Sequence, residues 1–219
     1  MKTLKSILIT RPHHDLITTY LYYWSQSIIE EAKNKNIQIF DLSGKKANKT
    51  QLISYIKKHN PTFIHFNGHG SNSLIAGYDN EILIEANKDD KLLAQKIIYA
   101  LSYDSAKILG YSCVKNGALA FIGYKRKYIL AYDVKSYTRP LKDKLARLFL
   151  EPSNLITISI LKGNTVGNAY QKSQDSMSRH FLYMISTKAT ALEKDASSFL
   201  WANKKCQTLI GDENSKLTS

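Results

Sequence analysis

The chain has 219 residues, 43% of them hydrophobic, a length and composition that suit one α/β domain with a real core. No stretch approaches the roughly 18 consecutive apolar residues that a membrane span needs, so no membrane partner is expected. The formal net charge is +13, but the lysines are spread along the chain and the densest basic cluster, 125–127, is short. We interpret this charge mainly as solvated surface, with an acidic protein or RNA partner as the alternatives.

The first half of the chain predicts alternating strands and helices. The apolar run at 6–10 predicts a strand, and the four-residue spacing of apolar side chains over 15–35 predicts a helix. The next predicted elements are a strand over 37–42, a helix over 50–59 capped by Thr50, a strand over 62–66 that ends at Asn67-Gly68-His69-Gly70, and a β-hairpin formed by 74–76 and 82–84.

The second half continues the same alternation. Its predicted elements are a helix over 89–101, a strand over 106–111, a strand over 128–132, helices over 141–150, 153–161 (which alternates enough to be a strand) and 165–186, a helix over 189–203 and a strand over 207–210. Such alternation predicts a mostly parallel sheet with helices on both faces. We expect one domain over 1–212 and a polar tail over 213–219, with fraying over 211–219.

A histidine and a cysteine follow two successive predicted strands. His69 comes just after the third strand and Cys113 just after the fourth. In open parallel sheets functional residues gather at the carboxyl ends of the strands, and neighbouring strands lie roughly 4.8 Å apart. An imidazole beside a thiol is what a cysteine nucleophile needs, and the amides of Gly70 and Cys113 are candidates for an oxyanion hole. The alternative for Cys113 is a small buried hydrophobe, and we expect Cys206 to be packed and inert.

No cofactor or metal is expected. His13, His14 and Asp15 are of metal-ligand type, but no matching cysteine or histidine cluster in the sequence completes a site. The chain carries neither a phosphate-binding P-loop nor a dinucleotide-binding glycine motif. Two cysteines make no disulfide framework, and the apolar run near the N-terminus is too short for a secretion signal. These features favour a cytoplasmic location.

Three stretches resemble the clan CD cysteine peptidases, specifically the gingipain and CHAT (caspase-related) branch. They are 63–70 (FIHFNGHG), 106–113 (AKILGYSC) and 208–212 (TLIGD). The separation of 44 residues between His69 and Cys113 is near the roughly 50 typical of caspases. The segment 111–115 is not the Q-A-C-x-G of caspases, so strict specificity for Asp is not carried over.

The resemblance covers about residues 6–212 and implies a caspase-like three-layer sandwich with about six strands. It also implies peptide-bond hydrolysis by a Cys–His dyad without a cofactor. In that family the loop after the first strand helps to build the substrate pocket, where Arg11 would favour an acidic residue and Asp15 a basic one. Both residues are equally consistent with surface charge or, for Asp15, a helix cap. Asn67 and Asp133 are further candidates for the pocket or for orienting the histidine.

The leading hypothesis is a cysteine endopeptidase that acts on a protein or peptide substrate and is activated by a partner or sensor protein. The alternative is a catalytically silent caspase-like module that binds an acidic protein. That alternative predicts that His69 and Cys113 lie too far apart, or that the thiol is buried. Direct nucleic-acid binding is the weakest hypothesis, because no motif of alternating aromatic and basic residues supports it.

Overall fold

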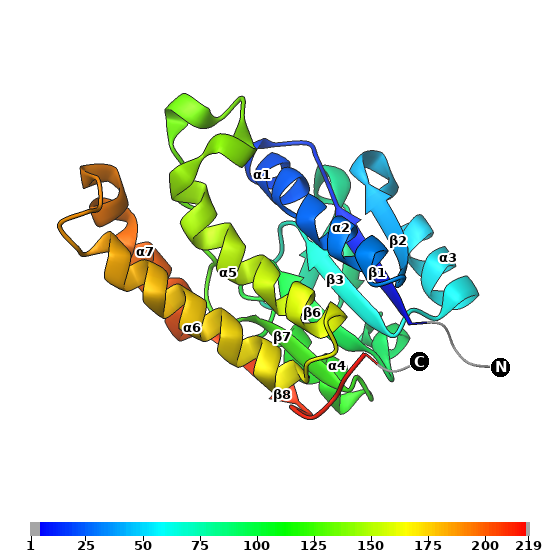
Figure 1. The fold of residues 1–219 in the computed structure, drawn as a ribbon. Coiled ribbons are helices and arrows are strands. Elements are labelled where there is room, and N and C mark those ends of the chain that lie inside the picture. Colours follow the sequence, from blue (N-terminus) through cyan, green and yellow to red (C-terminus); the bar gives the residue numbers. More distant parts are fainter. Residues whose placement is uncertain (1–4, 218–219) are drawn as a thin grey trace.

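A six-stranded sheet forms the centre of the computed structural model, which describes residues 5–217 (Figure 1). The strand order is β2-β1-β3-β6-β7-β8, and only β8 runs antiparallel to its neighbour. A separate hairpin, β4 with β5, follows the His69 loop. The strands are β1 (Ser6–Arg11), β2 (Gln38–Ser43), β3 (Phe63–Asn67), β4 (Leu74–Ala76), β5 (Ile82–Glu85), β6 (Ile97–Leu101), β7 (Ala120–Tyr124) and β8 (Gln207–Gly211).

Helices cover both faces of the sheet and complete a three-layer sandwich (Figure 1). The helices are α1 (Leu16–Trp24), α2 (Gln26–Asn34), α3 (Lys49–His59), α4 (Leu109–Lys115), α5 (Lys144–Leu161), α6 (Val166–Met184) and α7 (Ala191–Cys206). One apolar cluster joins the sheet to α1, α2, α5, α6 and α7, and a second joins the other face to α3, α4 and the hairpin. The predicted α/β fold class, with about six strands and the hairpin, is confirmed.

The central strands are apolar on both faces because both faces are covered. In β1, Ile7 and Ile9 belong to the cluster under α1 and α5, whereas Leu8 between them belongs to the cluster under α3 and α4. Successive residues of a strand therefore lie on opposite faces of the sheet, each in contact with a different layer of helices.

Three predicted elements in the middle of the chain are wrong. The segment 89–101 is not a helix: a short 3-10 turn over Asp90–Leu93 precedes strand β6. The segment 106–111 is not a strand, because helix α4 begins at Leu109, and 128–132 is irregular while the strand lies at β7. A short, continuous apolar run such as Ile97–Leu101 has no periodicity that separates a buried strand from a buried helix.

Smaller differences concern element ends. The predicted helix 15–35 is divided at Ser25 into α1 and α2, and Asn48 rather than Thr50 caps α3. A single helix, α5, continues through Pro152 over the two predicted ones. The tail is not frayed over 213–217, because Glu213 and Ser215 accept hydrogen bonds from the start of α6; residues 218–219 lie outside the described residues. Within 5–217, no helix has both the length and the apolar character needed to cross a membrane.

Candidate functional site

His69 lies just beyond the carboxyl end of β3, as predicted, and its ring is hydrogen-bonded to the Asp15 carboxylate. Nε2 of His69 is 2.5 Å from Oδ2 of Asp15, the residue that precedes α1. The His14 ring stands at a steep angle to the His69 ring, with centroids 6.0 Å apart, and its Nε2 is 3.5 Å from the same Asp15 oxygen. The β1–α1 loop and the β3 loop therefore place two imidazoles around one carboxylate.

Asp15 is held in place by helix α1. Its Oδ1 accepts a hydrogen bond from the backbone N–H of Thr18, and its own backbone N–H donates to the Thr18 hydroxyl oxygen, the reciprocal arrangement of a capping box. The Thr18 hydroxyl also donates to Oδ1. Burial acts to raise the pKa of Asp15, but the hydrogen bonds from Thr18 and His69 outweigh it and leave the pKa below its ordinary value. Asp15 is thus an N-cap and the partner of His69 at once.

Replacing Asp15 tests this double role. We expect Asp15→Ala to lower the free energy of unfolding by about 1 kcal/mol at neutral pH, because the N-cap is lost. The lowered pKa means that the carboxylate stabilises the fold above its ordinary pKa, and that this contribution disappears as the pH falls through the lowered value. Urea unfolding at neutral and acidic pH measures both effects. Asp15→Asn, which keeps a good cap, is the control; equal stability of Asp15→Ala and wild type at neutral pH contradicts the prediction.

The side chain that faces His69 from the neighbouring strand is Tyr103. Strand β6 pairs with β3, ends at Leu101, and is followed by Ser102 and Tyr103. The Tyr103 and His69 rings are 5.7 Å apart between centroids. Burial, and then the nearby Asp15 charge, raise the pKa of Tyr103. Ser102 is buried and donates its hydroxyl to the backbone oxygen of His69 at 3.0 Å.

Cys113 is not at a strand end, and the structure does not bring it together with His69. It lies in α4 with 0% of its surface exposed, inside the apolar cluster on the α3 and α4 face. Tyr103, which contacts His69, packs against the cluster on the opposite face. The Cys113 carbonyl accepts from Ala118, just before β7, so the residue lies near the amino ends of the strands. Burial raises the pKa of its thiol well above the ordinary value.

The predicted oxyanion-hole donors are separated as well. Gly70 follows His69 and is bridged to Ile75 in β4, whereas Cys113 is inside α4. A side chain at Gly70 would meet the Ser102 hydroxyl oxygen closely and the Leu74 carbonyl at 2.7 Å. The glycine is therefore required by packing against β6 and β4, which explains its presence without an oxyanion role.

The other predicted pocket residues serve different contacts. Arg11 is buried and forms a bidentate ion pair with Asp41 of β2. Asn67 is fully buried, with its side-chain oxygen 3.1 Å from a ring nitrogen of His65. Asp133 caps a 3-10 turn far along the chain and lines a separate cavity with Lys142 and Lys144. Of the predicted pocket residues, Asp15 alone contacts His69 through its side chain.

The structure is similar to solved gingipains. Gingipain R (RgpB), an Arg-specific cysteine proteinase, matches with a TM-score of 0.64 at 10% sequence identity, over 98% of this chain and 48% of that one. The complex of the Porphyromonas gingivalis RgpB pro- and mature domains matches with a TM-score of 0.60 at 11% identity, over 99% and 49%. This chain has a caspase-like fold. It spans about half the length of the gingipain chains. No protein-family model and no curated protein sequence matches it.

The expected resemblance is confirmed at the level of the caspase-like fold, and the CHAT branch stays a prediction. Sequence reasoning missed Tyr103 because it placed the fourth strand at 106–111. The signal that could have found it is the run Ile97–Leu101, rich in strand-forming residues and closed by the polar segment 102–105. A strand there places residues 102 and 103 next to the His69 loop.

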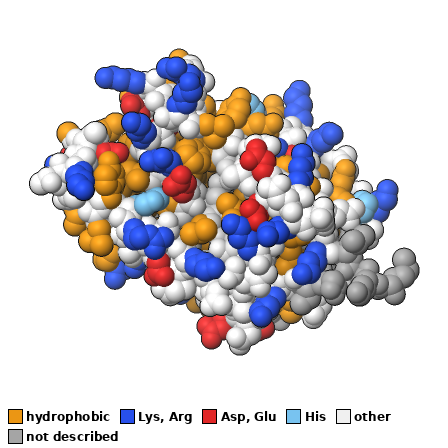
Figure 2. All heavy atoms as spheres, in the orientation of Figure 1, with side chains coloured by type: hydrophobic (Ala, Val, Ile, Leu, Met, Phe, Trp, Pro, Cys, Tyr) orange, Lys and Arg blue, Asp and Glu red, His pale blue; other side chains and the backbone are white. Residues whose placement is uncertain are grey.

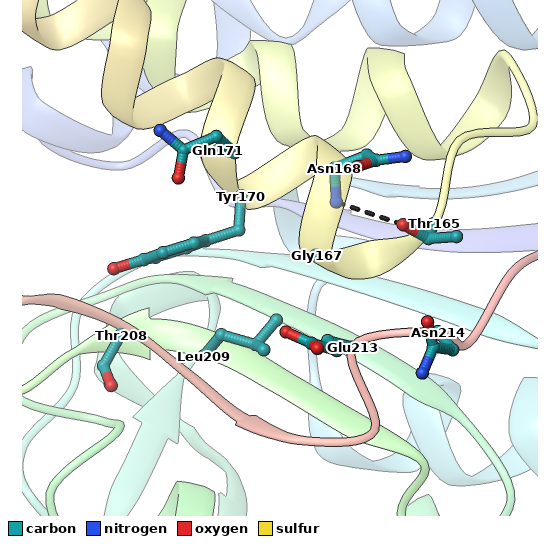
Figure 3. Close-up of a pocket in the computed structure, with 9 residues that line it drawn as sticks. All are labelled: Thr165, Gly167, Asn168, Tyr170, Gln171, Thr208, Leu209, Glu213 and Asn214. Carbon is teal, nitrogen blue, oxygen red and sulfur yellow. Dashed lines mark hydrogen bonds between the residues drawn. The ribbon is translucent and has the colours of Figure 1, made fainter.

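Besides the cavity lined by Asp133, two larger cavities lie outside the His69 cluster. Figure 3 shows one between the start of α6 and β8, where Tyr170 and Glu213 line a space of about 510 Å³. Its Glu213 follows the end of β8 that pairs with the amino end of β7, so it is remote from His69. The other cavity, about 560 Å³, is lined by Lys125, Arg126, Lys127, Ile129, Ala202, Lys205 and Cys206. The Lys127 ammonium lies 5.1 Å from the Tyr103 ring, which links this basic cavity to the site.

Proposed function

We propose that this chain is a catalytically silent caspase-like module that binds an acidic segment of a partner protein. The observation that carries the proposal is that a phenol, Tyr103, faces His69 at the end of β6 where a dyad needs a thiol. The raised pKa of Tyr103 keeps that phenol protonated at neutral pH. Neither cysteine replaces it, because Cys113 is in the core and Cys206 points its sulfur at the backbone of Arg126 and Asn203.

The endopeptidase hypothesis is supported by the fold alone. RgpB, whose structure is similar, is a cysteine proteinase, but cysteine catalysis requires a thiolate within reach of the imidazole. Ordering loops around the site would not move Cys113 to His69, since that residue is held by helix α4 and by packing against the sheet. An activating sensor protein therefore has no dyad to complete here.

The basic cavity supports an acidic occupant. Four of its seven lining residues are cations, Lys125, Arg126, Lys127 and Lys205, and none is acidic. On the face that Figure 2 draws, Lys and Arg side chains lie among acidic, hydrophobic and other side chains. The mature domain of RgpB is seen in complex with its pro-domain, which is consistent with a protein partner for this fold. Concentrated positive charge favours a Glu- or Asp-rich segment through steering and complementarity.

Thiol labelling tests catalytic silence. We expect an iodoacetamide probe to label Cys113 in the native protein no faster than the fold opens, because the thiol is buried and its pKa is raised. The labelling rate is expected to be unchanged in His69→Ala. Mass spectrometry of wild type, Cys113→Ala, Cys206→Ala and His69→Ala assigns the site. Fast labelling that needs both Cys113 and His69 contradicts the proposal and restores the endopeptidase hypothesis.

Binding of a poly-Glu peptide tests the partner class. We expect the triple variant Lys125→Ala/Arg126→Ala/Lys127→Ala to bind at least about tenfold more weakly than wild type, since opposite charges across an interface add affinity. The control is Lys46→Ala/Lys57→Ala/Lys58→Ala, which removes the same charge from exposed lysines outside the cavity. An equal loss of peptide affinity in both variants would mean that only the net charge matters, and would contradict binding at the basic cavity. Tighter binding of single-stranded RNA, with the steep salt dependence of phosphate contacts, would favour the nucleic-acid hypothesis instead.

A further inference from the structure

The strongest unassigned cluster is formed by His14, Asp15 and His69. One ligand-type atom from each residue lies within 4.8 Å of the other two. In the sequence, His69 follows Asp15 by 54 positions. The β1–α1 loop supplies two of the ligands and the β3 loop supplies the third. No other group of three or more His, Cys, Asp and Glu within 5–217 meets this spacing.

His14 lacks the partners that a buried imidazole requires. Its side chain is 9% exposed, and neither ring nitrogen has a hydrogen-bond partner. Leaving a buried polar atom without a partner costs about 1–3 kcal/mol, so native structures usually satisfy such atoms. The ring is positioned by Tyr78, at 5.3 Å between centroids, and by His69. A ligand at the Asp15 oxygen would satisfy the Nε2 of His14.

We propose that His14, Asp15 and His69 bind a zinc ion. Two imidazoles and one carboxylate are a common zinc donor set, whereas calcium and magnesium prefer oxygen ligands alone. Oδ1 of Asp15 accepts hydrogen bonds from Thr18, which leaves Oδ2 to face both histidines. These hydrogen bonds also fix the orientation of the carboxylate, as hydrogen bonds from outside the ligand set do in metal sites. Three protein ligands leave a fourth position, on the side where Asp15 and His69 are partly exposed.

The present distances require adjustment before all three ligand atoms reach tetrahedral spacing, and the imidazole nitrogens of His14 and His69 start within 4.8 Å of each other. In a tetrahedral site with bonds of about 2.0–2.1 Å, ligand atoms are separated by about 3.4 Å. The His14 and Asp15 atoms already lie 3.5 Å apart, whereas the hydrogen-bonded His69 and Asp15 atoms are at 2.5 Å. Zinc takes the position of the hydrogen between His69 and Asp15, so that Nε2 of His69 ligates while Nδ1 carries the ring proton of the neutral imidazole, and the two atoms separate by about 1 Å.

The test uses the untagged full chain, dialysed against a chelator and titrated with zinc chloride by calorimetry. We expect one ion per chain, and binding roughly 100-fold weaker or lost in His14→Ala, Asp15→Asn and His69→Ala, since each removes a ligand. Cobalt(II) added instead of zinc is expected to give the visible absorption of a four-coordinate site in wild type and in the His13→Ala control, but not in the three ligand variants. His13→Ala, at the exposed neighbouring histidine, is the control and is expected to bind as wild type.

Asp15→Asn retains a helix cap, so it separates loss of the ligand from loss of the fold, and circular dichroism verifies each variant. Wild-type zinc affinity in His14→Ala or His69→Ala overturns the proposal. Equal weakening by His13→Ala also overturns it, because it indicates nonspecific binding at surface histidines. Calorimetry of zinc is independent of thiol labelling and of peptide binding, so the zinc site and the silent-module proposal stand or fall separately.

Discussion

Acidification from neutral pH toward pH 4 is expected to destabilise the protein strongly through His65. This histidine of β3 is completely buried; burial lowers its pKa from 6.5 to about 3, although the hydrogen bond to Asn67 acts in the opposite direction. Between these values the unfolded chain binds a proton that the folded chain does not. The contribution of neutral His65 to the free energy of unfolding is therefore fully present above pH 6.5. The free energy of unfolding then decreases as the pH falls toward 3, by about 1.4 kcal/mol per pH unit at most.

The measurement is the free energy of unfolding in urea at several pH values from 7 to 4. In His65→Gln, the slope of the free energy of unfolding against pH is expected to fall by up to about 1.4 kcal/mol per pH unit, which corresponds to one bound proton. This holds whatever the effect of the substitution on stability at neutral pH. The control is Thr157→Val, which removes the hydroxyl 2.8 Å from the His65 ring but keeps the histidine. It is expected to be less stable than wild type and to keep the wild-type slope. The same slope in His65→Gln and wild type would contradict the assignment.

The second large effect is expected at Gly68, between β3 and His69. Its φ is +148°, and an added Cβ would clash with the carbonyl oxygen of Ala76 in β4. Because that neighbour is backbone, Gly68→Ala combines conformational strain with a clash that no side-chain rotation relieves. We expect the free energy of unfolding to fall by roughly 3 kcal/mol or more.

Gly163→Ala is the matched control. Gly163 also has a positive φ, +86°, but an added Cβ would meet nothing within 4 Å. That substitution is expected to cost only the conformational part, about 1 kcal/mol. Urea unfolding of both variants measures the difference, and similar losses would show that the contact between the His69 loop and β4 adds nothing to strain.

The Gly68 contact also bears on the site. The backbone oxygen of His69 accepts hydrogen bonds from the Ala76 amide and the Ser102 hydroxyl, so the loop is tied to both β4 and the end of β6. The His69 ring is therefore fixed by Asp15 on one side and by its own backbone on the other. This rigid placement suits a metal ligand as well as it suits a catalytic base, and the facing Tyr103 favours the former.

Local sequence determined much of the outer fold. The apolar runs of β1 and β3, the amphipathic stripes of α3 and α6 and the turn between β4 and β5 each contain their own signal, because burial on one side produces a period that neighbouring residues reveal. His69 was correctly placed for the same reason: β3 is apolar until Asn67 and is followed by a glycine-flanked loop.

Tertiary structure decided the centre of the sheet and hence the site. Ile97–Leu101 and Leu109–Lys115 are both too short to show a clear period, so only their neighbours make one a strand between β3 and β7 and the other a helix on the far face. Gly110 fits α4 because Phe121 and Ile210 pack against it, a contact between distant segments. Sequence proximity likewise grouped His13 with His14 and Asp15, whereas the third ligand-type residue is His69, which only the folding of β3 beside β1 brings to them.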